Sequence, residues 1–495
     1  MNIPYELEEC RQVIHQEALD YGLDFYETIF EILDYGQLNE VAAYGGFPTR
    51  YPHWRHGMGF ERLDKEYRYG LSKIYELVIN NNPCYAYLLG SNSLTENKLV
   101  IAHVYGHSDF FKNNYWFSKT NRKMMDRMAN HATRVRRMID ERGQEDVEDF
   151  LDRALSLENL VDLHGLMGEL GTDPEQEEDD EPNVLRKLKS RDYMDPYINP
   201  PEYLERQKAR MEEDEQRQKK HPAEPVRDVM RFLLENAPLE RWECDLLDIA
   251  REEALYFAPQ RCTKIMNEGW ASYWHRKIMT EKILTDEDFV DYADTMSSTL
   301  AGGGAVNPYK IGIELFMDIE DRWNKGRHGL EFDRCADFGE RQVWDTNAMT
   351  GRDQIFFARK VHNDVTFIDE FLTEEFCHSQ KLFVYQWNPR TKRKEIATRD
   401  FPAVKEQFLR QLANGGAPVI EVVDSNHANR GELYLTHRWD GQDLRADYTS
   451  ETLRNVQRIW KRPVLLETRT EGRRQLFFTD GEKEKVQDLG TVDES

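Results

Sequence analysis

The sequence predicts an α+β protein, with a large, mainly helical N-terminal domain and a small C-terminal α+β domain. Three observations indicate this class. Apolar residues recur at helical spacing until about residue 380, strand-like segments gather after it, and a helix-strand-strand pattern appears twice in that C-terminal part. A chain of 495 residues also exceeds the usual size of one core, so two or three domains are expected.

Apolar periodicity predicts the first helices at residues 5–35 and at about 64–80, 94–111 and 119–142. Residues 43–59 combine Gly and Pro with aromatic side chains, which predicts an ordered loop that lies against the core. The segment Ser93-Leu-Thr-Glu96 matches a capping box, so Glu96 is expected to cap the third helix.

An acidic segment without aromatic residues interrupts the helical region at residues 171–182. Such a composition cannot bury enough apolar surface to order itself. We therefore divide the chain into a helical domain, first part (1–170), an acidic linker with an exposed charged helix (171–222), the second part of the helical domain (223–378) and a C-terminal α+β domain (379–495).

The C-terminal domain contains an internal repeat. The segment 409–437 resembles the segment 453–480, and each copy has the pattern helix, strand, turn, strand. This arrangement predicts an antiparallel sheet that the two repeat helices cover on one face.

The amino-acid composition argues against several classes of function and location. The net charge is −25, and such a field repels phosphate backbones, so no nucleic-acid partner is expected. The six cysteines are scattered without a CxxC pair, which predicts free thiols in a reducing cytosol. The N-terminus lacks the features of a secretory signal, and no run of 18 apolar residues predicts a membrane span. A cytoplasmic protein is expected.

The pair His103 and His107 is the strongest chemical signal. Four-residue spacing places both imidazoles on one face of a helix, as in the HExxH sites of zinc enzymes. Position 104 is Val, where those enzymes place the Glu that acts as general base. A hydrolase built on this pair therefore needs its base elsewhere, and Glu40, just before a Gly-Gly-Phe-Pro loop, is one candidate.

A second signal is Asn267-Glu-Gly-Trp-Ala-Ser-Tyr-Trp-His275. It is similar to the segment that supplies the third metal ligand in some HExxH peptidases, with Glu268 at the matching position and His275 as a further ligand two turns along. Zn²⁺ suits two imidazoles and a carboxylate best, while Fe²⁺ and Mn²⁺ also fit. Tyr273 is a candidate to stabilise an oxyanion. The alternative interpretation is structural: a buried His pair, a paired carboxylate and an ordinary core tyrosine.

Several long segments resemble the bacterial SpoVR (stage V sporulation protein R) family. They are residues 39–55, 103–114, 267–275, 307–312 and 361–373. The resemblance implies a role in spore cortex formation where the host sporulates, or in a stress response elsewhere. It also implies protein partners, namely a PrkA-type serine kinase and its associated protein.

Two functions from different classes follow. The first is a metal-dependent hydrolase of divergent zincin type, with a metallopeptidase-like helical core and a divalent metal held by His103, His107, Glu268 and His275. The second is a non-catalytic regulatory or scaffold protein whose metal is structural, a hypothesis that Val104 favours. An iron- or manganese-dependent redox enzyme needs more carboxylates than the sequence places near the pair.

Overall fold

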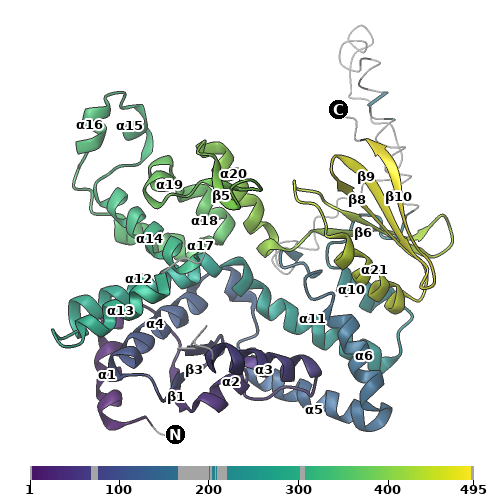
Figure 1. The fold of residues 1–495 in the computed structure, drawn as a ribbon, viewed down its shortest axis with the longest axis horizontal. Helices are drawn as coiled ribbons and strands as arrows, with labels where there is room; N and C mark the ends of the chain where they lie inside the picture. Colours follow the sequence, from purple (N-terminus) through teal and green to yellow (C-terminus); the bar gives the residue numbers. More distant parts are fainter. Residues whose placement is uncertain are drawn as a thin grey trace, which may run out of the picture. The chain divides into compact units, whose positions relative to one another are not determined.

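The computed structural model describes residues 3–68, 76–165, 220–300 and 307–491, with isolated positions between 200 and 208 (Figure 1). The chain forms two compact units, one of residues 1–147 and 256–416, the other of residues 148–255 and 417–495. The composition-based division into four parts stays a prediction, and most of its acidic part, 171–222, lies outside the described residues. The fold class is confirmed: a large helical N-terminal region precedes a C-terminal five-stranded sheet.

Helices make up most of the first unit. In chain order its described elements are α1 (Tyr5–Asp20), β1 (Thr28–Leu33), α2 (Tyr35–Ala43), α3 (Trp54–Arg68), β2 (Glu76–Ile79), β3 (Cys84–Leu89), α4 (Leu94–Asn113), η1 (Trp116–Lys119), α5 (Met124–Arg142), α12 (Lys264–Ile278), η3 (Met279–Ile283), α13 (Phe289–Leu300), α14 (Pro308–Asn324), α15 (Gly329–Arg334), α16 (Phe338–Val343), α17 (Gly351–Val361), α18 (Asp364–Phe371), α19 (Glu374–Gln380), β4 (Val384–Asn388), β5 (Arg393–Thr398), α20 (Phe401–Leu412) and η4 (Ala413–Gly416). Helices α6 (Gln144–Leu155) and α11 (Arg241–Cys262) run from one unit into the other.

A small three-stranded sheet lies where the sequence pattern predicted parts of two helices. Its strand order is β1-β3-β2, with β1 parallel and β2 antiparallel to β3. The predicted helix 5–35 is wrong after Asp20, because Gly22 adopts a positive φ of 79° and the β-favouring segment Thr28–Leu33 pairs with β3. The predicted helix 64–80 is also wrong: α3 ends at Arg68 and the residues from Glu76 form β2. The predicted loop 43–59 likewise becomes helix from Trp54.

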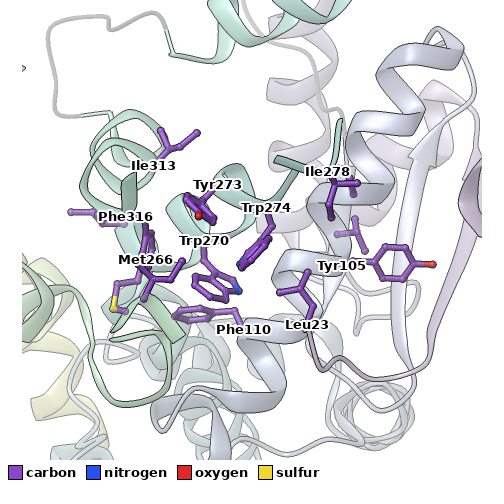
Figure 2. Packing of buried hydrophobic residues seen from close by; sticks show 14 of the residues in the cluster. Leu23, Tyr105, Phe110, Met266, Trp270, Tyr273, Trp274, Ile278, Ile313 and Phe316 are labelled. Carbon is purple, nitrogen blue, oxygen red and sulfur yellow. The ribbon is translucent and has the colours of Figure 1, made fainter. Parts of the chain in front are cut away.

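Helices α4 and α12 form the centre of the first unit. Nearly every residue of α4 is buried, and the capping box of Ser93 and Glu96 is confirmed at its start. Figure 2 shows the aromatic packing around α12, where the ring of Trp270 contacts Trp274 of the same helix and Phe316 of α14, and Phe110 of α4 belongs to the same core cluster. Both helices also bury polar side chains, including His103 and His107 of α4 and Glu268 of α12.

Small residues let α12 approach both of its neighbours at backbone distance. A Cβ atom on Gly106 of α4 would lie 2.7 Å from the Cα of Ala271. A Cβ atom on Gly312 of α14 would lie 2.3 Å from the carbonyl oxygen of Ile265 and 2.5 Å from the Cα of Gly269. Real side chains do not tolerate such distances to backbone atoms, so glycine is required where these three helices meet.

The second unit contains α10 (Val229–Asn236), α21 (Ala446–Trp460) and a five-stranded sheet. The strands are β6 (Ile420–His427), β7 (Glu432–His437), β8 (Val464–Thr470), β9 (Arg473–Thr479) and β10 (Glu484–Thr491), in the order β10-β9-β8-β7-β6. The expected antiparallel pattern is wrong at one pair, since β7 and β8 are parallel. The reason is that α21 connects these strands, and a crossover helix returns the chain to the end at which the previous strand began.

The helices on this sheet also differ from the prediction. Helix α21 packs against β8 and β9, and α10 packs against β6. The first repeat helix, α20, instead packs against α18 and β4 within the first unit. The predicted free thiols are confirmed, because none of the six cysteines is in a disulfide. None of the helices in the described part of the chain combines the length and apolarity that crossing a membrane requires.

The glycine contacts predict that a Gly→Ala substitution lowers the stability of the protein at position 312 and does not lower it at position 57. We expect Gly312→Ala to destabilise the first unit by roughly 3 kcal/mol, because the new methyl group meets backbone atoms that cannot move aside. Gly57→Ala in α3 is the matched control, since its Cβ meets nothing within 4 Å and Ala has the higher helix propensity. Thermal unfolding followed by circular dichroism measures both. Equal melting temperatures for the two variants would contradict the close packing.

Candidate metal centre

Four side chains from three elements meet in the first unit. His103 and His107 project from α4, Glu268 from α12 and Glu76 from the start of β2. The Nε2 atom of His103 lies 3.3 Å from Glu76 Oε1 and 3.6 Å from Glu268 Oε2. The Nε2 atom of His107 lies 3.6 Å and 3.4 Å from the same two oxygens.

These distances fit a shared cation. Ligands bound at about 2.0–2.2 Å with near-tetrahedral angles lie about 3.3–3.6 Å apart, which is the range of all four carboxylate–imidazole distances. One ligand atom each from Glu76, His103 and His107 lies within 4.8 Å of the other two. The donor set of two imidazoles with carboxylates suits Zn²⁺, and Fe²⁺ or Mn²⁺ as well.

One buried oxygen supports this interpretation independently. The side chain of Glu268 is only 7% exposed, and its Oε2 accepts no hydrogen bond from the described residues. A buried carboxylate oxygen without a partner is costly and rare. The nitrogen atoms nearest to it are Nε2 of His103 and of His107, at 3.6 and 3.4 Å, and a cation between them would interact with all three atoms at once.

The opposite ring nitrogens are held in place by buried neighbours. His107 Nδ1 is 2.9 Å from Asn267 Oδ1, an acceptor, so Nδ1 carries a proton, and Nε2 is the nitrogen that would bind an ion after losing its own proton. His103 Nδ1 is 2.7 Å from His275 Nδ1, and His275 Nε2 is 3.0 Å from Met296 Sδ. When His103 binds through Nε2, its Nδ1–H donates to His275, which then donates its own Nε2–H to the sulfur of Met296.

The charges of the site are strongly coupled. Burial opposes protonation of His107, but the negative charges of Glu268 and Glu76 raise its pKa to about 10. Burial also opposes ionisation of Glu268, yet His107, His103 and Lys264 hold the pKa of that carboxyl well below its usual range. Burial lowers the pKa of His275 well below its usual range, which keeps this ring neutral. Without a bound ion, protonated His107 therefore supplies the positive charge beside the carboxylates, and a divalent ion that binds its Nε2 would displace that proton and take over the same role.

Two further side chains border the carboxylates. Lys264 Nζ donates to Glu268 Oε1 at 2.5 Å, which occupies the oxygen that faces away from the imidazoles. The ring of Tyr309 stacks on His103 with centroids 6.3 Å apart. Burial and the neighbouring Glu268 and Glu76 carboxylates raise the pKa of the Tyr309 hydroxyl, so it stays protonated.

The structure places the predicted site residues in three groups. His103, His107 and Glu268 come together as proposed ligands, while His275 lies behind His103 and contacts it through Nδ1. Glu40 is exposed on α2. Tyr273 is buried, and its hydroxyl donates to Glu320 Oε2 at 2.6 Å. Among the described contacts, none joins Glu40 or Tyr273 to the imidazoles, and their catalytic roles stay predictions.

Sequence reasoning missed several residues of the site. Glu76 gave no signal, because it lies in a segment predicted as helix and belongs to no motif. Asn267 and Tyr309 lie inside two of the segments that carry the family resemblance, and this position was the one sequence signal that pointed to them. Lys264 is four residues before Glu268 on α12, a spacing that favours an ion pair on a helix.

Comparison with known proteins agrees with the resemblance. The family model described as "SpoVR like protein" matches residues 3–417, and the model described as "SpoVR-like C-terminal domain" matches residues 418–471. The chain is 28% identical over 488 residues to a protein of Escherichia coli (strain K12) described as "Uncharacterized protein YcgB", covering 92% of this chain and 91% of the relative. No solved structure matches. The chain therefore belongs to the SpoVR family.

Proposed function

We propose that this SpoVR family member is a metal-dependent hydrolase of divergent zincin type. The observation that carries the proposal is the buried Oε2 of Glu268, which lies 3.4 and 3.6 Å from two imidazole nitrogens on a facing helix and forms no hydrogen bond with the described residues. Two imidazoles and one carboxylate are the protein ligands of several catalytic zinc sites, which keep a fourth position for water or substrate.

The residues of the site have distinct roles in this proposal. His103, His107 and Glu268 hold the ion, and Asn267 and His275 fix the ring orientations of the two histidines. A divalent ion bound there supplies Lewis acidity, which lowers the pKa of water and polarises a carbonyl group. Glu76 is the more exposed of the two carboxylates, at 18% against 7%, and would serve as the general base that HExxH enzymes provide at the position occupied here by Val104.

The biological setting of the proposal rests on the family resemblance. We propose that the reaction belongs to spore cortex formation or to a stress response, and that its substrate is an amide or similar bond of a cell-wall precursor. The same resemblance supplies the cytoplasmic partners that we propose, a PrkA-type kinase and its associated protein.

A second candidate function is a non-catalytic regulatory or scaffold protein with a structural metal. Val104 favours it, because the helix lacks the usual general base. The position of Glu76 also favours it, since four protein ligands close the coordination shell and leave no position for a substrate. The role of Glu76 therefore distinguishes the two functions.

Metal content tests the site itself. We expect the purified full-length protein to contain about one equivalent of Zn²⁺, Fe²⁺ or Mn²⁺, measured by inductively coupled plasma mass spectrometry. His107→Ala and Glu268→Gln remove ligand atoms and should reduce this content to below about a tenth of an equivalent. His378→Ala is the control, because this histidine is exposed on α19 and distant in the chain from the site.

Circular dichroism establishes that each variant is folded. A folded wild-type protein that takes up none of the three metals, even after they are added and excess is removed, would contradict the proposal.

Glu76→Gln tests which of the two functions applies. As a general base, Glu76 is not required to hold the ion, so the variant should retain about one equivalent of metal with its affinity changed less than tenfold. Competition with a chelator of known affinity measures this change. If Glu76→Gln loses metal as fully as Glu268→Gln does, Glu76 is a ligand. The result would then favour the second function, with a closed structural metal site, over the hydrolase.

A further inference from the structure

The hairpin formed by β4 and β5 presents large apolar side chains to solvent. The pairing register places Tyr385 opposite Ile396 and Trp387 opposite Lys394, so these four residues share one face of the two-stranded sheet. Tyr385 is 46% exposed, Trp387 58% and Ile396 40%. Two aromatic residues and an aliphatic one are thus grouped on a ribbon in the first unit, beside α20 (Figure 1).

Positive charge gathers at the turn of the same hairpin. Arg390, Lys392 and Arg393 are exposed there, and Lys394 follows them. The acidic residue of this segment, Glu395, accepts hydrogen bonds from Asn388 and Thr391 at 2.8 and 2.7 Å, so it is turned toward the turn and away from the apolar face. The hairpin is therefore basic in a chain whose net charge is −25.

We propose that this hairpin docks the protein reversibly on an anionic lipid bilayer. Trp and Tyr side chains favour the boundary between lipid headgroups and hydrocarbon, and Ile396 adds an aliphatic anchor. Each Lys or Arg close to an anionic surface strengthens binding about fivefold. Acidic residues of the rest of the chain weaken binding where they lie within the screening distance of about 8–10 Å from that surface. The inference is independent of the metal centre.

Other occupants fit the surface less well. A stable protein interface buries about 800 Å² on each partner, whereas three half-exposed side chains offer only part of that area. Single-stranded nucleic acid follows a charged groove along several nucleotides. Here the cations lie at the turn of a two-stranded hairpin, and Ile396 offers no ring on which a base stacks.

Vesicle sedimentation tests the proposal with the full-length protein. We expect binding to vesicles of phosphatidylglycerol and phosphatidylcholine in equal parts at low salt, at least tenfold weaker binding at 0.5 M NaCl, and little binding to pure phosphatidylcholine. Tyr385→Ser/Trp387→Ser and Arg390→Glu/Lys392→Glu should each reduce binding to the anionic vesicles at least tenfold, because all four side chains are exposed and the fold does not bury them.

Two control variants carry the same kinds of change elsewhere. Tyr448→Ser/Leu330→Ser removes two other exposed apolar side chains, and Lys483→Glu/Lys485→Glu reverses two other exposed charges. Both should bind like the wild type. The proposal is overturned if the wild-type protein does not sediment with anionic vesicles at low salt, or if the hairpin and control variants lose binding equally. Tighter binding of a single-stranded 20-nucleotide DNA than of the vesicles, lost in the hairpin variants, would also overturn it.

Discussion

Helix α12 contacts α4 and α14 through positions that carry almost no side chain. Gly106 meets Ala271 on one side of α12, and Gly269 meets Gly312 on the other. The three glycines are close in sequence to groups of the metal centre: Gly106 precedes His107, Gly269 follows Glu268, and Gly312 is three residues after Tyr309. The close packing of the helices therefore sets the positions of the site groups.

This constraint explains how short polar contacts form inside an apolar core. Helices that pack through large side chains lie 8–10 Å apart. At the glycine positions the backbones come closer, which lets Glu268 reach both imidazoles and lets Asn267 and His275 reach the far nitrogens of the same rings. The imidazoles and Glu268 are buried, and electrostatic interactions between them are stronger there than they would be in water.

The sequence predicted the parts of the fold that depend on local pattern. The helix 94–111, the capping box at Ser93 and the helix-strand-strand repeat follow from residue spacing and propensity over short distances. The strand at Thr28–Leu33 was not predicted, because its stability comes from pairing with β3, about 56 residues away. The residues of Thr28–Leu33 alone do not indicate which segment they pair with. The parallel β7–β8 pair likewise depends on the path of α21.

In the candidate site, too, local sequence pattern predicted some residues, while others are brought in only by the folding of distant segments. The four-residue spacing of His103 and His107 is visible in one helix, and the segment around Glu268 resembles a known ligand helix. Glu76 comes from a strand, and its proximity to the imidazoles arises only from the packing of α4 against β2. His275 shows the limit of helical spacing as a guide: it lies on α12 as predicted, but its contact is with the Nδ1 of His103.

X-ray absorption spectroscopy of the metal-loaded, full-length protein tests the central claim most directly. The account predicts two imidazole nitrogens and at least one carboxylate oxygen at about 2.0–2.2 Å from the metal. A first shell of water oxygens alone, or a sulfur ligand at about 2.3 Å, would contradict the account.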